Sequence, residues 1–301
     1  MNALLIGIGI FGSVVIWPIN RWVTRSGSRP AVYGFWLCLT GAILSGIAAV
    51  VTGQPIRNPM VWVIGGTIGV AFAIGFCLVV MYCLRIGPAG PTVVMNNMGM
   101  LWPVILGAVW LRPHALNALT VIGAILAIIA LIGFGFSRPG GSEAEQAASK
   151  KTSRRWAFWA FVAWLMSGIS QGTQLIGSLQ VPDGAVAITF AYNTTSVLVL
   201  TPLVIRELRL AHVRNTPAMN WREVVGGVAN GVVLVASMIA VLTVLTRVGA
   251  EVVFPFTVAG PMIVVLFLGQ YLYKEHLDRI GWIACGLGTV GLIMLSVGQG
   301  V

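Results

Sequence analysis

Amide and hydroxyl side chains recur at helical spacing inside several stretches of the sequence that are otherwise apolar. The clearest series has intervals of four, three and four, which place its members on one face of a helix: Ser167, Gln171, Gln174 and Ser178. Amides both donate and accept hydrogen bonds, so this face suits the groups of a hydroxylated or zwitterionic molecule better than it suits an ion. The pattern therefore predicts a binding site for a small polar molecule.

Other apolar stretches carry polar residues of the same kind. They are Ser13, Trp17 and Asn20; Asn96 and Asn97 before Trp102; Thr189, Asn193 and Ser196 with Tyr192 alongside; and Asn230 with Ser237. The candidate substrate-binding residues are Asn96, Asn97, Trp102, Gln171, Gln174, Tyr192, Asn193 and Asn230. The alternative is that such side chains only join helices to one another through hydrogen bonds, at about 0.6 kcal/mol each in a membrane.

Acidic residues are absent from the middle of the apolar stretches. Asp183 and Glu251 stand at predicted helix starts, where a carboxylate interacts favourably with the helix dipole. Glu251 has a second possible role, in binding a coupling proton or a substrate amine. A site for cationic drugs normally needs a carboxylate deep in the membrane, so the sequence disfavours cationic substrates.

Metal and cofactor sites are not predicted. The cysteines lie in apolar runs and form no CxxC pair, and the histidines are too far apart in sequence for ligand spacing. These residues are Cys38, Cys77, Cys83 and Cys285, and His114, His212 and His276.

The composition requires a lipid-facing surface. Hydrophobic residues make up 57% of the 301 residues and charged residues only 9%, whereas soluble domains carry roughly a quarter. The net charge of +10 comes from basic residues in short gaps between apolar runs, as at the flanks of membrane helices. No basic face is interleaved with aromatic residues, so a nucleic-acid partner is not expected.

A bilayer span needs about 20 apolar residues, and the sequence contains ten such stretches. They are 3–20, 31–52, 60–84, 88–111, 116–136, 156–178, 184–205, 223–246, 250–273 and 277–298. Nine or eleven spans stay possible, because the third and fourth are separated only by Arg85, Gly87 and Pro88. The first stretch lacks a basic leader and a cleavage site, so we expect a retained helix rather than a signal peptide.

The chain repeats itself in two halves. A shift of 162 residues superposes Gly65, Gly69, Arg85, Gly87, Gly107 and His114 on Gly227, Gly231, Arg247, Gly249, Gly269 and His276 without a gap. We expect a first five-helix repeat over 1–136, a solvated cytoplasmic linker over 137–155 and a second repeat over 156–301. Two glycines four apart clear one helix face, so the third helix of each half should pack tightly on a neighbour.

The positions of the basic residues predict the orientation. The loops between the predicted spans are numbered in chain order, beginning after the first span. Fifteen of the 18 Lys and Arg residues fall in the odd-numbered loops. These loops should therefore be cytoplasmic, with both termini on the other side of the membrane. The base-rich loops differ between the halves, as expected if the two copies are inserted in opposite senses. Inverted repeats are typical of secondary transporters, in which one half rocks against the other.

The repeat ends resemble the EamA-like repeat of the drug/metabolite transporter superfamily. The residues that carry this resemblance are Arg247, Gly249, Glu251, Pro255, Pro261, Gly269, Lys274, Glu275, Gly281 and Gly286. The first half has a similar frame from Arg85 to Gly123 but carries Pro113 in place of Glu275. The resemblance implies an all-α membrane protein of ten helices, in which the first four of each half surround a cavity. Helices 116–136 and 277–298 would be peripheral, as a possible homodimer contact.

These observations together predict a multi-pass protein of the inner (cytoplasmic) cell membrane. We expect a secondary transporter that moves a small neutral or zwitterionic metabolite, of amino acid or sugar type, by alternating access. The alternatives are a membrane-embedded lipid-modifying enzyme and a channel or scaffold. An enzyme is disfavoured because its candidate clusters, Arg112/His114 and Lys274/Glu275/His276, would lie on opposite sides of the membrane.

Overall fold

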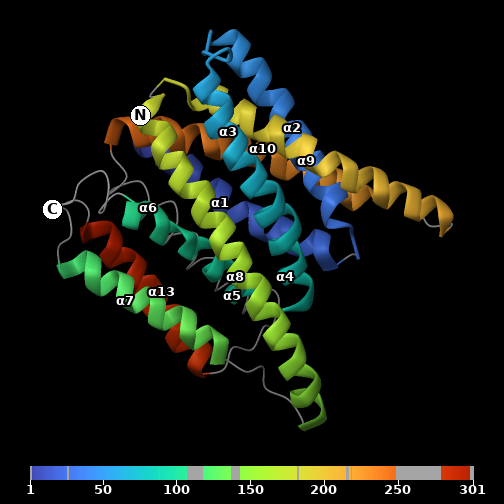
Figure 1. Cartoon of the computed structure of the whole chain (residues 1–301), viewed down its shortest axis with the longest axis vertical. Helices are drawn as coiled ribbons and strands as arrows, with labels where there is room; N and C mark the ends of the chain where they lie inside the picture. The colour runs from blue at the N-terminus through green and yellow to red at the C-terminus, as the bar shows by residue number, and fades with distance from the viewer. Residues whose placement is uncertain are drawn as a thin grey trace.

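The fold is helical throughout the part of the chain that the computed structural model describes. The described residues are 2–25, 27–87, 89–106, 118–136, 143–181, 183–214, 217, 219–248 and 279–298, and these ranges contain no strand (Figure 1). The predicted ninth span, 250–273, lies outside them, together with Glu251 and the two clusters near His114 and His276.

The helices of the first half are α1 (Asn2–Arg25), α2 (Pro30–Val51), α3 (Pro59–Phe72), α4 (Met81–Ile86), α5 (Ala89–Asn97), α6 (Leu101–Leu106) and α7 (Ala118–Phe136). A π-helix, η1 (Ala73–Val80), joins α3 to α4, and a 3₁₀ turn, η2 (Met98–Met100), joins α5 to α6. The second half contains α8 (Glu143–Gln180), α9 (Ala185–Val213), α10 (Trp221–Val248) and α13 (Arg279–Gly298).

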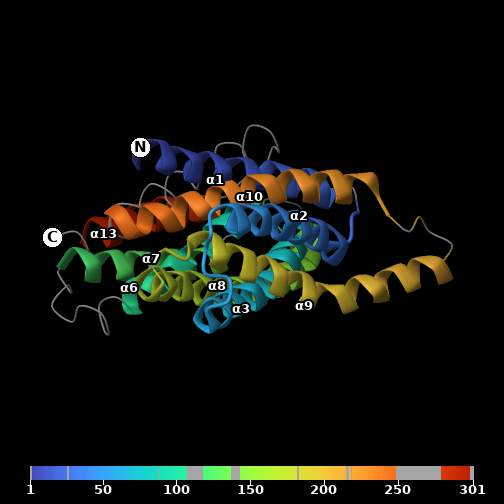
Figure 2. The same cartoon turned by 90° about the horizontal axis from the view of Figure 1, so that it is seen from above.

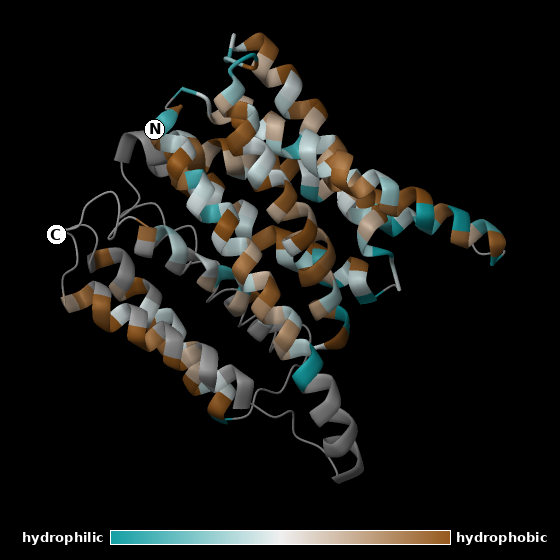
Figure 3. Cartoon of the chain, viewed as in Figure 1, coloured by the Kyte–Doolittle hydropathy of each residue, from teal (hydrophilic) through white to brown (hydrophobic). Residues whose placement is uncertain are grey.

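Five of the described helical segments are long and apolar enough to cross a bilayer. They are Leu4–Arg25, Pro30–Val51, Pro59–Ile86, Ala185–Val213 and Trp221–Val244. Hydrophilic residues concentrate toward segment ends, as at the protruding end of α9 (Figure 3). The length and composition of these segments indicate a membrane protein.

Local chemistry sets where these helices begin and end. Pro59 begins α3, and the Asn58 side chain accepts a hydrogen bond from the Met60 amide at 3.0 Å. After α2, Gly53 has φ +64°. Its amide donates to Val50, and the Gln54 amide donates to Ala49, which closes the helix with a Schellman motif.

Two helices differ from the predicted spans. The sixth was expected from residue 156, but α8 begins at Glu143 and takes in most of the predicted linker. The sequence from 143 to 151 consists mainly of Glu, Ala, Gln and Lys, which are strong helix formers in water as well. The fourth span is interrupted by η2. Pro103 has no amide hydrogen to give the Gly99 carbonyl, which explains the break.

The longer helices form two groups of three. In the first group α10 packs against both α1 and α2, and in the second α3 packs against both α8 and α9. The groups meet where α2 lies along α9. Outside both groups α7 pairs with α13 at one edge of the molecule (Figures 1 and 2).

Both predicted glycine pairs lie at close helix crossings. A Cβ added at Gly65 would lie 2.5 Å from the Ala191 Cβ on α9, and one at Gly69 would lie 2.5 Å from the Tyr192 carbonyl oxygen. On α10, a Cβ at Gly231 would lie 2.6 Å from the Leu37 carbonyl oxygen of α2. The prediction that the third helix of each half packs tightly is confirmed.

Basic residues from several helices gather at one end of the molecule, here named the base-rich end. It carries Arg21, Arg25, Arg85, Arg154, Arg155 and Arg222. Contacts join these helix ends. Arg21 donates to the Leu84 carbonyl, the Arg155 guanidinium lies 5.6 Å from the Tyr82 ring centroid, and Arg222 lies 5.6 Å from that of Trp22.

Candidate binding cavity

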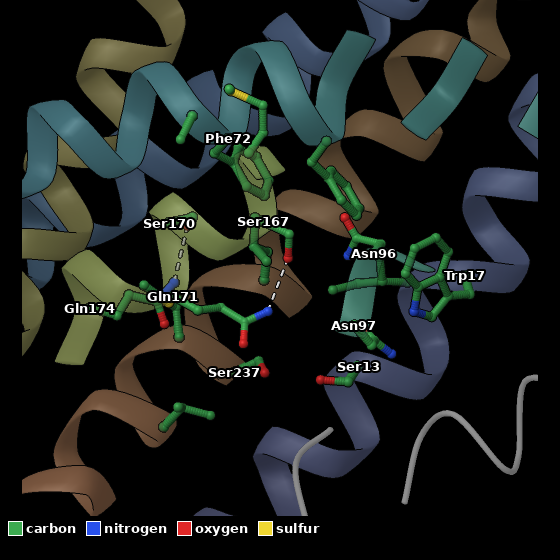
Figure 4. A pocket seen from close by; sticks show the side chains of 17 residues that line it. Ser13, Trp17, Phe72, Asn96, Asn97, Ser167, Ser170, Gln171, Gln174 and Ser237 are labelled. Atoms are coloured by element: carbon green, nitrogen blue, oxygen red, sulfur yellow. Dashed lines mark hydrogen bonds between the residues drawn. The ribbon is translucent and has the colours of Figure 1, made fainter. Parts of the chain in front are cut away.

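A cavity of about 210 Å³ lies between the two helix groups, with α5 at its side (Figure 4). It is lined from α1 by Ser13, Ile16 and Trp17; from α3 and η1 by Ala71, Phe72 and Phe76; from α5 by Asn96 and Asn97; from α8 by Met166, Ser167, Ser170, Gln171 and Gln174; and from α10 by Leu234, Ser237, Met238 and Val241. None of these side chains is charged.

The α8 wall presents Ser167, Gln171 and Gln174 of the predicted series, while Ser178 is not part of the lining. Gln171 Nε2 donates to Ser167 Oγ at 3.0 Å, and Gln174 Nε2 donates to Ser170 Oγ at 3.3 Å. In each glutamine the amide nitrogen therefore donates to a serine of the same helix, and the carbonyl oxygen takes no part in that bond. Among the described residues the buried Gln171 Oε1 has no hydrogen-bond partner, which leaves an acceptor at the cavity for a ligand.

Amide and hydroxyl groups also reach the cavity from the other side. Asn96 and Asn97 end α5 and approach from the side opposite Gln171 (Figure 4). Ser13 and Ser237 come from α1 and α10, and Ser237 Oγ donates to the Gly9 carbonyl at 3.2 Å. The 3₁₀ turn η2 begins directly after Asn97, so the helix is interrupted where these amides meet the cavity.

Aromatic rings form a third wall. Phe72 and Phe76 stack with centroids 4.9 Å apart and an interplanar angle of 15°. Trp17 meets Phe76 edge-on at 5.8 Å. Phe76 lies within the π-helix η1, a feature that often marks functional sites because the wider turn re-aims side chains. The cavity thus combines flat apolar faces with neutral hydrogen-bonding groups.

Described side chains close the cavity toward the base-rich end. Beyond Trp17 and Phe76, Val80 and Leu84 are at most 1% exposed. Arg21 of α1 donates to the Leu84 carbonyl of α4. Trp156 Nε1 donates to Thr92 Oγ1 at 3.0 Å and joins α8 to α5. The first contact joins α1 to α4, which continues the segment of α3, and the second holds α5 against α8.

Asn230 lies in a buried network next to the cavity rather than in its lining. Its Nδ2 donates to Asn20 Oδ1 at 2.9 Å and lies 3.3 Å from the Ile16 carbonyl oxygen. The Tyr33 hydroxyl donates to the same Asn20 oxygen. All three polar side chains are fully buried, so the network joins α1, α2 and α10 inside one helix group.

Three other predicted site residues also lie outside the lining. Tyr192 is buried on α9 and meets Phe72 edge-on at 5.5 Å, behind the aromatic wall. Asn193 faces Gly41 of α2 and donates to the Thr189 carbonyl of its own helix. Trp102 packs over Gly168 and Trp164. The structure brings together Asn96, Asn97, Gln171 and Gln174.

Sequence reasoning left several lining residues out of the predicted set. Ser13 and Trp17 belong to a polar series at helical spacing, but they are not among the predicted substrate-binding residues. Phe72, Phe76 and Met238 gave no signal, because an aromatic or aliphatic residue in a membrane helix has the same sequence pattern whether it faces lipid, protein or a cavity.

No protein-family model and no curated protein matches the sequence. A solved structure described only as "Crystal structure of protein" aligns with 97% of this chain and 96% of its own, with a TM-score of 0.57 and 18% sequence identity. The likeness at this identity is one of fold alone, and it extends over almost the full length of both chains.

Proposed function

We propose that this chain is a secondary transporter that moves a small neutral or zwitterionic metabolite, of amino acid or sugar type, across the cytoplasmic membrane by alternating access. The observation that carries the proposal is the cavity between the two helix groups. Three of the helices that line it, α1, α3 and α10, belong to segments of membrane-spanning length, and the Arg21–Leu84 contact lies on its side toward the base-rich end. An uncharged site that offers amide and hydroxyl groups between such helices fits a small solute that is bound and then released.

Reciprocal packing supports an inverted ten-helix repeat, in which 250–273 would supply the missing span. The glycine pair of α3 faces α9, and the equivalent pair of α10 faces α2. The same shift of 162 residues relates Phe72 to Leu234 and Phe76 to Met238, and all four line the cavity. Exchanging the halves therefore leaves the pattern of contacts in place, as an inverted duplication requires.

The packing also favours particular moving units. The group of α1, α2 and α10 takes helices from both halves of the sequence, and so does the group of α3, α8 and α9. The two groups, rather than the two halves, would rock against each other about the α2–α9 contact. Opening the base-rich end would then break the bridge between Arg21 and Leu84.

Reconstitution tests the proposal. Proteoliposomes holding the full chain would be given a panel of radiolabelled amino acids, sugars and nucleobases. We expect saturable uptake of one class, accelerated when the same unlabelled compound is inside. A flux that stays linear with concentration and shows no such acceleration would indicate a channel, and chemical conversion of the solute would indicate an enzyme. Either result would contradict the proposal.

A further inference from the structure

The charge of the cavity limits its ligand. Its 17 described lining residues include no acid and no base. A carboxylate or an ammonium group removed from water without a counter-charge carries a large desolvation cost. A free amino acid has both groups, and neither would meet an opposite charge on these walls. The lining therefore favours an uncharged ligand.

The two sides of the cavity have different chemistry although the packing makes them equivalent. A Cβ at Gly12 of α1 would touch Ser237, and a Cβ at Gly75 would touch Met166 of α8. Because Gly75 and Ser237 are related by the repeat shift, Gly12 is equivalent to Met166. Ser13 and Ser167, the next residues in each helix, are then also equivalent. Four residues further along, Trp17 is equivalent to Gln171. One half of the sequence supplies rings where the other supplies an amide and aliphatic groups.

Flat rings beside amides that lie on two sides of the cavity suit a flat ligand with polar edges. Nucleobases stack on aromatic side chains in a sequence-tolerant way, and Asn or Gln can pair with a base edge through adjacent donor and acceptor groups. Asn96 and Asn97 offer both donors and acceptors, and Gln171 Oε1 is an acceptor without a partner among the described residues. A sugar would place only C–H groups on Phe72 and Phe76, whereas the π-face of a base stacks on such rings.

The size of the cavity points the same way. Its volume of about 210 Å³ is below the roughly 300–1,000 Å³ of sites for drug-sized ligands. A single small ring system fits such a space, whereas a lipid-linked sugar or a large drug does not.

We propose that the cavity binds an uncharged planar nitrogen heterocycle of the nucleobase class, stacked beside Trp17 and Phe76, with polar groups on opposite edges that face Gln171 on one side and the Asn96–Asn97 pair on the other. This assignment deepens the proposed transporter function and rests on it. It keeps the small neutral solute and the transport mechanism of that proposal, and it puts the nucleobase class in place of the amino acid or sugar type.

Direct binding tests this assignment. The purified full chain in detergent would be incubated with tritiated adenine or tritiated uracil, with unlabelled glucose, glutamine or phenylalanine as competitors. We expect at least one base to bind saturably and the competitors to leave it in place. Trp17→Ala and Gln171→Leu should each weaken binding roughly 5- to 150-fold, the range expected for losing one base-stacking or pairing interaction. Trp17→Phe, which keeps a ring, should retain most of the affinity.

Matched variants outside the cavity serve as controls. Trp62→Ala removes an indole that packs on Phe190, and Gln180→Leu removes an exposed amide at the end of α8. Both should bind like the wild type. Monodisperse elution on size-exclusion chromatography identifies the folded variants.

Three results would overturn the assignment. They are the absence of binding by either base, displacement of the base by glucose or a free amino acid, and unchanged affinity in both folded cavity variants. Failure of the transporter proposal has a different signature, in which a base binds as described but does not cross the proteoliposome membrane. Transport of an amino acid without binding of either base would support the transporter proposal and contradict the nucleobase assignment.

Discussion

Single side chains hold the helix starts at the base-rich end. Glu223, in the first turn of α10, is 1% exposed and accepts from the Arg29 backbone amide at 2.6 Å and from Arg29 Nη2 at 2.9 Å. It also accepts from the Asn220 amide at 3.2 Å. One carboxylate thus serves the residue before α2 and the loop before α10, because amide donors cluster at helix starts.

Replacing this carboxylate should destabilise the protein. Glu223→Gln keeps the size but removes the charge, and hydrogen bonds to charged groups contribute about 1.5–3 kcal/mol each. We expect the free energy of unfolding in detergent to fall by about 2–3 kcal/mol, measured by intrinsic fluorescence during denaturant unfolding. Asp183→Asn, at an exposed site, is the control. Equal stability of the two variants would show that the Glu223 contacts contribute little.

Substitutions of Asn230 and Gln171 should affect different quantities, the first the free energy of unfolding and the second the ligand affinity. Asn230→Ala removes the Nδ2 donor from the buried Asn20 carbonyl oxygen and leaves only the Tyr33 hydroxyl bonded to it, which should lower the free energy of unfolding by about 1–3 kcal/mol. It should leave ligand affinity nearly unchanged. Gln171→Ala should weaken ligand binding and leave the free energy of unfolding nearly unchanged, because the Gln171 carbonyl oxygen has no protein partner among the described residues. Thermal unfolding with and without ligand measures both quantities, and a fall in both for each variant would contradict this division.

At the scale of elements, close helix crossings leave no room for a methyl group. A Cβ at Gly69 would lie 2.5 Å from the Tyr192 carbonyl oxygen, which belongs to the backbone of α9 and cannot turn aside. A Cβ at Gly286 of α13 would meet nothing within 4 Å. The same substitution therefore has opposite consequences at these two positions.

We expect Gly69→Ala to lower the free energy of unfolding by about 1–3 kcal/mol, as for other overpacked cores. Gly286→Ala should be neutral or slightly stabilising, because alanine is the better helix former. Denaturant unfolding in detergent compares the two variants. If Gly69→Ala is as stable as Gly286→Ala, the α3–α9 crossing is looser than these distances indicate.

Most helices could be predicted from the sequence, since hydropathy and length define a membrane span largely by themselves. The start of α8 could not, because hydropathy does not detect a helix that extends through the polar residues before 156. For the site, Gln171 and Asn97 were identifiable because amides are costly in lipid. Tyr192 and Asn193 share that property, yet they face other helices. Periodicity gives the face of a helix but not the neighbour on that face.

For the whole molecule, alternating access requires the base-rich end to open. Val80 is fully buried on the path from Phe76 to Leu84. In a chain whose native cysteines are replaced by alanine, a Val80→Cys thiol should react with a membrane-impermeant maleimide only when this end opens. Arg21→Ala removes the donor to the Leu84 carbonyl, so we expect labelling to become several-fold faster.

Labelling of inside-out and right-side-out vesicles measures this reaction and its side. Val51→Cys, which replaces a residue that is 80% exposed at the other end of α2, is the control and should react from the opposite side at an unchanged rate. A rigid bundle would label Val80→Cys at the same slow rate with and without Arg21. That outcome would contradict a moving base-rich end.

The exchange of helices between the two groups has a consequence for biogenesis. When the ribosome has released only the first repeat, α3 does not yet have α8 or α9 to pack against. In the same way, α1 and α2 do not yet have α10. Each nascent half therefore presents glycine-lined faces to lipid or to insertion chaperones until the late helices arrive. Residues 1–142 and 143–301 produced as separate polypeptides should be degraded when alone and accumulate together, which immunoblotting of membranes can follow. Equal persistence of either fragment by itself would mean that a half completes its own packing.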